Sequence, residues 1–144
     1  MSKIETALSE VREIEFPEHV NPSGELIVLE KAGGLPFDVQ RSFIVKGRPN
    51  AVRGTHAHKL CSQLMICVSG AIDVVCDDGA AQADYTLRNP KDGLLVPPGI
   101  WSQQTYLEDD TILLVLCDRP YEEDDYIRDR DAYLRFRGIS ETSS

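Results

Sequence analysis

The stretch GTHAHKLCSQLMICVSG, residues 54–70, joins a pair of histidines to a long apolar run. His56 and His58 are next-but-one neighbours, so on a β-strand both imidazoles project to the same face. The following run, Leu64 to Val68, has the length and composition of a buried strand. A histidine pair of this kind serves as metal ligands, as an acid and a base, or as exposed polar side chains, and the spacing alone leaves all three open.

Strand-length apolar runs continue on both sides of this stretch. They comprise Leu26 to Leu29, Val39 to Val45, Ala71 to Cys76, Leu94 to Val96 and Ile112 to Cys117. Turn signals rich in Gly, Pro and Asp separate them, and the dipeptide Ser69-Gly70 predicts a tight hairpin between its two flanking runs. Because no long helical runs join these segments, the sequence predicts an all-β fold, an antiparallel sandwich or jelly roll.

One short helix is expected at the carboxyl end. Residues Asp125 to Phe136 place apolar side chains amid charged ones in a rough amphipathic pattern. The acidic run Glu122 to Asp125 reads either as a cap for this helix or as a solvated turn. The chain of 144 residues has ordinary globular proportions, 42% hydrophobic and 27% charged, which predicts a single domain over residues 1–144 with its core at about 22–136 and polar termini.

Charge and cysteine usage narrow the classes of function. A net charge of −9 argues against sequence-independent binding to nucleic acid, which needs clustered basic residues. No apolar stretch approaches the roughly 20 residues needed to span a membrane, and the amino terminus lacks the apolar segment of a signal peptide. The four cysteines show no Cys-x-x-Cys spacing and read as buried free thiols. We therefore expect a cytoplasmic protein with no membrane partner.

Two segments resemble the motifs of the cupin family. Gly54 to Gly70 is similar to the first cupin motif, and Gly93 to Ser102 is similar to the second, which implies a cupin jelly-roll barrel. Metal-binding cupins add a carboxylate after the histidine pair and end the second motif in a third histidine, whereas this chain has Gln63 and Ser102. An amide and a hydroxyl complete a poor cage for a transition metal, so we expect no metal and no cofactor. The histidines are then left for proton transfer, since an imidazole has an ordinary pKa of about 6.5.

A narrower resemblance covers the chain from about Leu26 to Phe136. It is similar to the metal-free nucleotide-sugar 3,4-ketoisomerases, which act on dTDP-4-keto-6-deoxyglucose. The segments that carry it are Val39 to Arg41, Arg53 to Lys59, Gln63, Asp77 to Gly79, Gly93-Leu94, Ile100-Trp101 and Asp124 to Arg128. The resemblance implies a homodimer that binds a dTDP-linked sugar and moves its keto group between C4 and C3 through an enediol, with His56 or His58 as the base.

The resemblance also implies a set of substrate-binding residues. Arg41 and Arg53 are candidates to face the diphosphate or the enolate oxygen, where a guanidinium fork fits. Lys59 and Gln63 follow as further candidates from the same motif. Trp101 either stacks on the ligand or belongs to the core, and the sequence leaves both open.

Three positions depart from the family pattern. Ser23 replaces an arginine before Gly24, Phe43 replaces a tyrosine, and Ser102 replaces the histidine after Trp101. These changes favour a different sugar nucleotide, an altered reaction or weak catalysis. Two other functions therefore stay open, a related cupin epimerase or isomerase and a non-catalytic sugar-nucleotide binding module. A metal-dependent dioxygenase-type cupin is disfavoured by Gln63 and Ser102.

Overall fold

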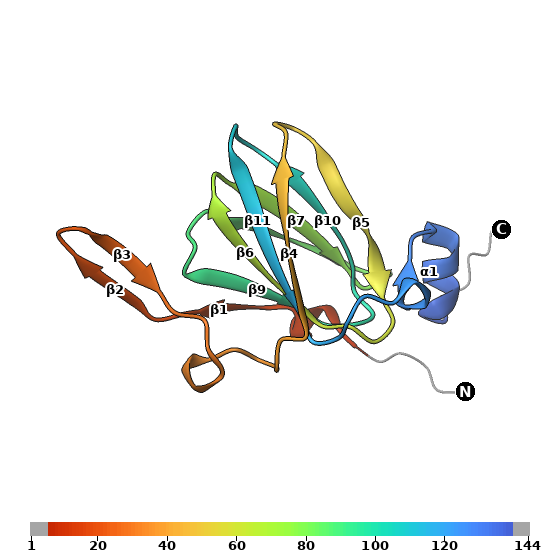
Figure 1. Cartoon of the computed structure of the whole chain (residues 1–144). Coiled ribbons are helices and arrows are strands. Elements are labelled where there is room, and N and C mark those ends of the chain that lie inside the picture. Colours follow the sequence, from red (N-terminus) through yellow and green to blue (C-terminus); the bar gives the residue numbers. More distant parts are fainter. Residues whose placement is uncertain (1–5, 140–144) are drawn as a thin grey trace.

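Two antiparallel five-stranded sheets face each other in the computed structural model, which describes residues 6–139 (Figure 1). The first sheet has the order β1 (Arg12–Glu15), β9 (Asp92–Val96), β6 (Gln63–Ser69), β11 (Thr111–Cys117) and β4 (Arg41–Gly47). The second has the order β12 (Tyr126–Ile127), β5 (Val52–His58), β10 (Trp101–Tyr106), β7 (Ile72–Asp77) and β8 (Gln82–Leu87). A separate hairpin pairs β2 (Glu18–Asn21) with β3 (Gly24–Ile27), and the single α-helix of the described residues is α1 (Arg130–Phe136). The predicted all-β sandwich with a short C-terminal helix is confirmed.

Apolar side chains pack in three clusters, one between the sheets and one on part of the outer face of each sheet. The space between the sheets holds the main core, which includes Ile72, Val74, Leu94, Tyr106, Leu113 and Val115. Phe16 and the segment after β3 cover Leu64 and Ile66 on the outer face of the first sheet. Helix α1 covers the outer face of the second sheet through Tyr133. Burial on both faces explains why β6 reads as an uninterrupted apolar run.

The predicted hairpin at Ser69-Gly70 is wrong. Strand β6 pairs with β9 and β11 in the first sheet, whereas β7 pairs with β8 and β10 in the second. The chain therefore crosses from one sheet to the other at Gly70, which adopts a φ of 79°. A β-carbon at this position would lie 2.3 Å from Thr111 Oγ1, so the crossing requires glycine.

The predicted helix over Asp125 to Phe136 starts too early. The residues before it form a 3-10 turn, Glu123–Asp125, and then strand β12, in which Tyr126 pairs with His58 and Ile127 with Ala57. The helix begins only after Asp129, whose side chain caps it by accepting a hydrogen bond from the Ala132 N–H at 2.9 Å. Pairing with β5 therefore overrides the amphipathic pattern over this segment.

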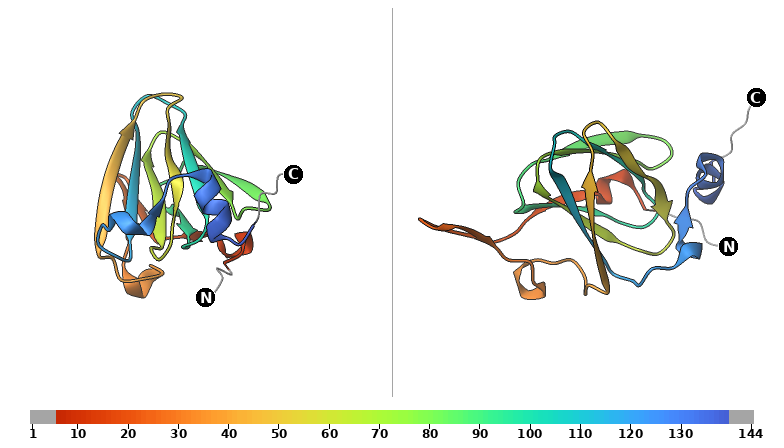
Figure 2. Two further views of the ribbon diagram at one scale, coloured as in Figure 1. Left: turned by 90° about the vertical axis from the view of Figure 1, so that its right-hand side faces the viewer. Right: turned by 45° about the horizontal axis from the view of Figure 1, so that its top comes forward.

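The described amino-terminal segment extends the core beyond the boundary expected near residue 22. Strand β1 pairs with β9, and the flanking Val11 and Phe16 are both buried. By contrast, the β2–β3 hairpin projects away from the sandwich (Figures 1 and 2). It exposes Val20 and Leu26 by 67% and 61%. No helix among residues 6–139 is long and apolar enough to cross a membrane.

Candidate active site

A cavity of about 230 Å³ opens between the two sheets. Its polar walls come from Arg41 on β4, Arg53 and His56 on β5, Gln63 on β6 and Gln104 on β10. Its apolar walls come from Phe43, Val45, Met65, Leu113 and Val115, and the rings of Tyr106 and Tyr126 complete the lining. None of these lining residues is an aspartate or a glutamate, so the cavity wall is positively charged although the whole chain is acidic.

A bulge in β5 brings Arg53 to the same wall as His56. On a regular strand these two residues would point to opposite faces, because their separation is odd. The pairing between β10 and β5 shifts, however: Ser102 lies opposite His56, while Gln104 lies opposite Arg53, so β5 contains one extra residue. Gly54 absorbs this insertion with a φ of 66°. The Gly-Thr that precedes the histidines is therefore what lets an arginine and a histidine line one cavity.

His58 lies directly behind this wall rather than on it. Its ring contacts those of His56 and Tyr126, with centroids 4.9 and 4.4 Å away, and its side chain is almost fully buried. His58 Nδ1 lies 2.8 Å from Asp125 Oδ2, while the other carboxylate oxygen accepts the Leu60 N–H at 2.6 Å. The second ring nitrogen, Nε2, is buried and has no partner among residues 6–139.

Burial and charge set the protonation of the two imidazoles. Burial, reinforced by the neighbouring His58, lowers the pKa of His56 to about 4. Burial also lowers the pKa of His58, but the hydrogen bond and charge of Asp125 oppose this shift. Both rings are therefore neutral at neutral pH. An ionised Asp125 fixes the His58 proton on Nδ1, which leaves a lone pair on Nε2.

Arg41 is held at the cavity by aromatic neighbours. Its Nη1 donates to the Tyr126 hydroxyl at 3.2 Å, and its guanidinium lies over the Phe43 ring, 4.7 Å from the centroid. A stacked and hydrogen-bonded guanidinium has little rotational freedom left to lose on binding an anion. Arg53, by contrast, is exposed at the cavity mouth.

The structure brings some of the predicted site residues together and separates others. Arg41, Arg53, His56 and Gln63 line the cavity, with His58 behind them. Lys59 lies outside the barrel in a different, acidic pocket. Trp101 lies on the outer face of β10, packed on Tyr133 of α1 at a centroid distance of 5.3 Å.

The three departures from the family pattern also separate in space. Phe43 lines the cavity, and Ser102 is buried opposite His56. Ser23 lies in the turn of the β2–β3 hairpin, where its N–H donates to Asn21 Oδ1 at 2.8 Å. The hairpin that carries this turn projects away from the sandwich (Figure 1).

Sequence reasoning missed Asp125 as a site residue. The acidic run Glu122 to Asp125 predicted a helix cap or a solvated turn, but Asp125 is 7% exposed and bonded to His58. The two partners are 67 residues apart in the chain, and only the fold joins them. Tyr106 was also missed; its hydroxyl is buried without a partner in the described part of the chain, and burial raises its pKa to about 12.

A family model described as FdtA, WxcM-like, C-terminal, matches residues 9–138. The chain belongs to this FdtA family. One curated relative, the TDP-4-oxo-6-deoxy-alpha-D-glucose-3,4-oxoisomerase of Aneurinibacillus thermoaerophilus, is 32% identical over 124 residues, which are 85% of this chain and 89% of the relative. The predicted resemblance to sugar 3,4-ketoisomerases is thereby confirmed.

Solved structures of two sugar 3,4-ketoisomerases share the fold of this FdtA-family chain. QdtA from Thermoanaerobacterium thermosaccharolyticum, solved in complex with TDP, superposes with a TM-score of 0.87 at 28% identity, covering 92% of this chain and 97% of its own. A 3,4-ketoisomerase from Helicobacter canadensis gives a TM-score of 0.86 at 31% identity, and the match covers 90% of this chain and 98% of that enzyme. The sandwich is therefore the fold of these enzymes.

Replacing Asp125 with asparagine tests the pairing that defines this site. In Asp125→Asn the negative charge that favours the imidazolium is lost, so the pKa of His58 should fall below its wild-type value. Ring-proton NMR titration of the three histidines measures this directly. Asp124→Asn is the control, because Asp124 is exposed and precedes Asp125 in the same turn. An unchanged or raised His58 pKa in Asp125→Asn would contradict the pairing.

Proposed function

We propose that this chain is a sugar-nucleotide isomerase that moves a keto group between C4 and C3 of a dTDP-linked 4-keto-6-deoxyhexose. The observation that carries the proposal is the buried His58–Asp125 pair, set against a cavity whose wall holds two arginines and His56. Family membership supports the same reaction, since relatives are named as 3,4-ketoisomerases or oxoisomerases. An enediol route transfers only protons, so the reaction requires no metal or redox cofactor.

His58 is the better base of the two histidines. When it removes the C3 proton through Nε2, the Asp125 carboxylate on Nδ1 stabilises the imidazolium that forms. Within residues 6–139 no carboxylate is hydrogen-bonded to His56, and a pKa of about 4 makes it a weak proton acceptor. Because Nε2 is buried and the Tyr126 ring lies against both imidazoles, this ring must move aside for the C3 proton to reach His58. His56 then contacts the sugar, and a proton returns at C4.

The arginines supply the charge that the intermediate needs. Removal of the C3 proton places negative charge on the sugar oxygens, and a fixed guanidinium such as Arg41 stabilises an enolate in a partly buried site. The cavity of about 230 Å³ is smaller than the roughly 300–1,000 Å³ typical for larger ligands, which suits a sugar ring with the nucleotide outside. Exposed Arg53 at the mouth is then placed for the diphosphate.

A related nucleotide sugar is the second candidate substrate. Phe43 and Ser102 stand where the family pattern has a tyrosine and a histidine. Phe43 lines the cavity, and Ser102 is buried opposite His56, which lines it. Phe43 lacks the hydroxyl of a tyrosine, and the side chain of Ser102 is shorter than that of a histidine, so two polar groups that would contact the sugar hydroxyls are lost or drawn back. A sugar with a different hydroxyl configuration would still place its C3 proton before His58, so the same base would serve an altered substrate.

A homodimer is part of the proposal, with a second copy of this chain as the partner. A two-stranded hairpin is at best marginally stable alone in water, yet β2–β3 projects from the sandwich with Val20 and Leu26 exposed. The family pattern also expects a substrate-facing residue at position 23, and Ser23 lies in the turn of this hairpin. Both features are accounted for if the hairpin packs on the partner subunit. We further place the enzyme in the cytoplasm, where its four free thiols stay reduced.

Proton NMR with dTDP-4-keto-6-deoxyglucose in deuterated buffer tests the reaction. The wild-type protein should generate 3-keto signals with deuterium at C4 of the product, and the reverse reaction should place deuterium at C3 of the recovered substrate. His58→Asn should slow both by about 10²–10⁴-fold, the usual contribution of a general base.

Asp84→Asn serves as the control, because Asp84 is exposed on β8, at the edge of the second sheet away from β5. It should exchange deuterium as the wild type does. If the wild type binds the sugar without exchange, the chain is a binding module, and if His58→Asn exchanges at the wild-type rate, His58 is not the base.

Light scattering after size exclusion tests the dimer. The wild type should elute with the mass of two chains, and the double variant Val20→Asp, Leu26→Asp should elute as a monomer, because charge on the hairpin opposes its burial. Glu25→Gln on the same hairpin is the control and should remain dimeric. A monomeric wild type, or a dimeric double variant, would refute this arrangement.

A further inference from the structure

We propose that His58, Cys61 and Asp125 together bind a thiophilic divalent cation such as Zn²⁺, entering from outside the barrel. A ring nitrogen, the Cys61 sulfur and a carboxylate oxygen lie within 4.8 Å of one another. All three side chains are more than nine-tenths buried. Within residues 6–139, this is the one set of three such donors found so close together.

The chemistry of these donors suits zinc. Zn²⁺ takes thiolate, imidazole and carboxylate ligands in a tetrahedral arrangement, and a mixed set of the three favours it over Mg²⁺ or Ca²⁺, which prefer oxygen. A water molecule would supply the fourth ligand. The donors come from the end of β5, the loop after it and the turn before β12, and these segments are joined by the Asp125 bond to Leu60.

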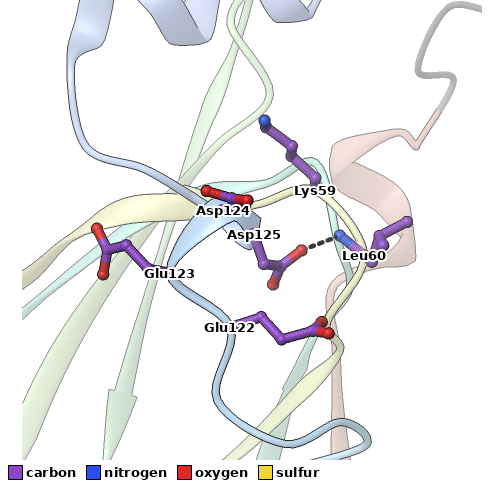
Figure 3. A pocket seen from close by; sticks show the side chains of 6 residues that line it. All are labelled: Lys59, Leu60, Glu122, Glu123, Asp124 and Asp125. Carbon is purple, nitrogen blue, oxygen red and sulfur yellow. Dashed lines mark hydrogen bonds between the residues drawn. The ribbon is translucent and has the colours of Figure 1, made fainter.

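An acidic pocket leads to this cluster from the surface. It is an open hollow of about 580 Å³ lined by Lys59, Leu60 and the run Glu122 to Asp125 (Figure 3). Four carboxylates and one amine line this pocket. Arg128 pairs with Glu123, but the remaining negative charge still attracts a cation to this side of the protein. Asp125 belongs both to the pocket and to the cluster, and Figure 3 shows its carboxylate directed inward at the Leu60 N–H. The pocket is therefore an entry path that ends at a ligand.

This site differs from the metal cage of metal-binding cupins. That cage uses the two motif histidines from inside the barrel, and here its other positions are Gln63 and Ser102. The proposed site instead uses the outer side of His58, because the ring nitrogen nearest the Asp125 carboxylate is Nδ1, at 2.8 Å from Oδ2. A cation there replaces the proton that Nδ1 and Oδ2 share.

Binding of the cation would switch off the proposed base. The Cys61 thiol loses its proton to solvent as its sulfur becomes a ligand. The proton displaced from Nδ1 is taken up at Nε2, so one proton is released overall and the ring stays neutral. Nε2 then carries a hydrogen in place of its lone pair and cannot accept the C3 proton. This consequence, unlike the binding itself, rests on the function proposed above.

Cobalt provides a direct probe, because Zn²⁺ has a filled d shell and is spectroscopically silent. Titration of the reduced full-length protein with Co²⁺ should saturate at one equivalent and produce a thiolate-to-cobalt charge-transfer band, which Zn²⁺ then removes by displacement. Cys61→Ser should lose the band. Cys67→Ser is the matched control and should keep it, because Cys67, like Cys61, is a buried thiol that donates to a nearby backbone carbonyl.

Two outcomes overturn the site: no charge-transfer band in the wild-type protein, or a band that persists in Cys61→Ser. Circular dichroism of both variants confirms that they are folded before the comparison is made. The isomerase assay is then run with and without one equivalent of Zn²⁺, which should inhibit the wild type and Cys67→Ser. Failure of that assay alone, with the cobalt band intact, counts against the proposed base and not against the metal site.

Discussion

The hydrogen bond between His58 and Asp125 is the contact on which the arrangement of this molecule depends. One carboxylate oxygen holds the imidazole and the other holds the Leu60 N–H, so the C-terminal segment is fixed to the end of β5. From that point Tyr126 and Ile127 pair with β5, and α1 follows as the cover of the second sheet. A single buried carboxylate thus sets the tautomer of a histidine and anchors the last element of the fold.

The site itself combines features that neither sheet has alone. The first sheet supplies Arg41 and Gln63, the second supplies Arg53 and His56, and the bulge at Gly54 lets the last two share a wall. Tyr126 closes the arrangement by bonding to Arg41 and lying against both imidazoles. His58 lies between two environments. The positively charged cavity is on one side of it, and the acidic pocket lies behind its partner Asp125. If both proposals hold, proton transfer and cation binding compete for one imidazole.

Local patterns in the sequence were sufficient for the fold class and for the histidine pair, whereas Arg41, Arg53 and Gln63 were expected only from the family resemblance. Alternating and continuous apolar runs specify strands, and the histidine spacing specifies a shared face. These patterns could not show that the chain crosses from one sheet to the other at Gly70, because the crossing depends on which strands pair later in the chain. The Asp125 partnership was hidden for the same reason, since an acidic run looks solvated until the fold brings His58 to it. Trp101 was ambiguous because core and ligand-stacking tryptophans have the same local sequence, and α1 decides its surroundings.

Base catalysis by His58 requires a nucleotide sugar to bind with its C3 next to this residue. A crystal structure of His58→Asn with dTDP-4-keto-6-deoxyglucose tests this most directly, because the substitution should let the unreacted substrate persist. We predict the sugar in the cavity between the sheets, with C3 facing residue 58 and the diphosphate beside Arg53. A sugar bound in the outer acidic pocket, or one whose C3 faces away from residue 58, would contradict the central claim.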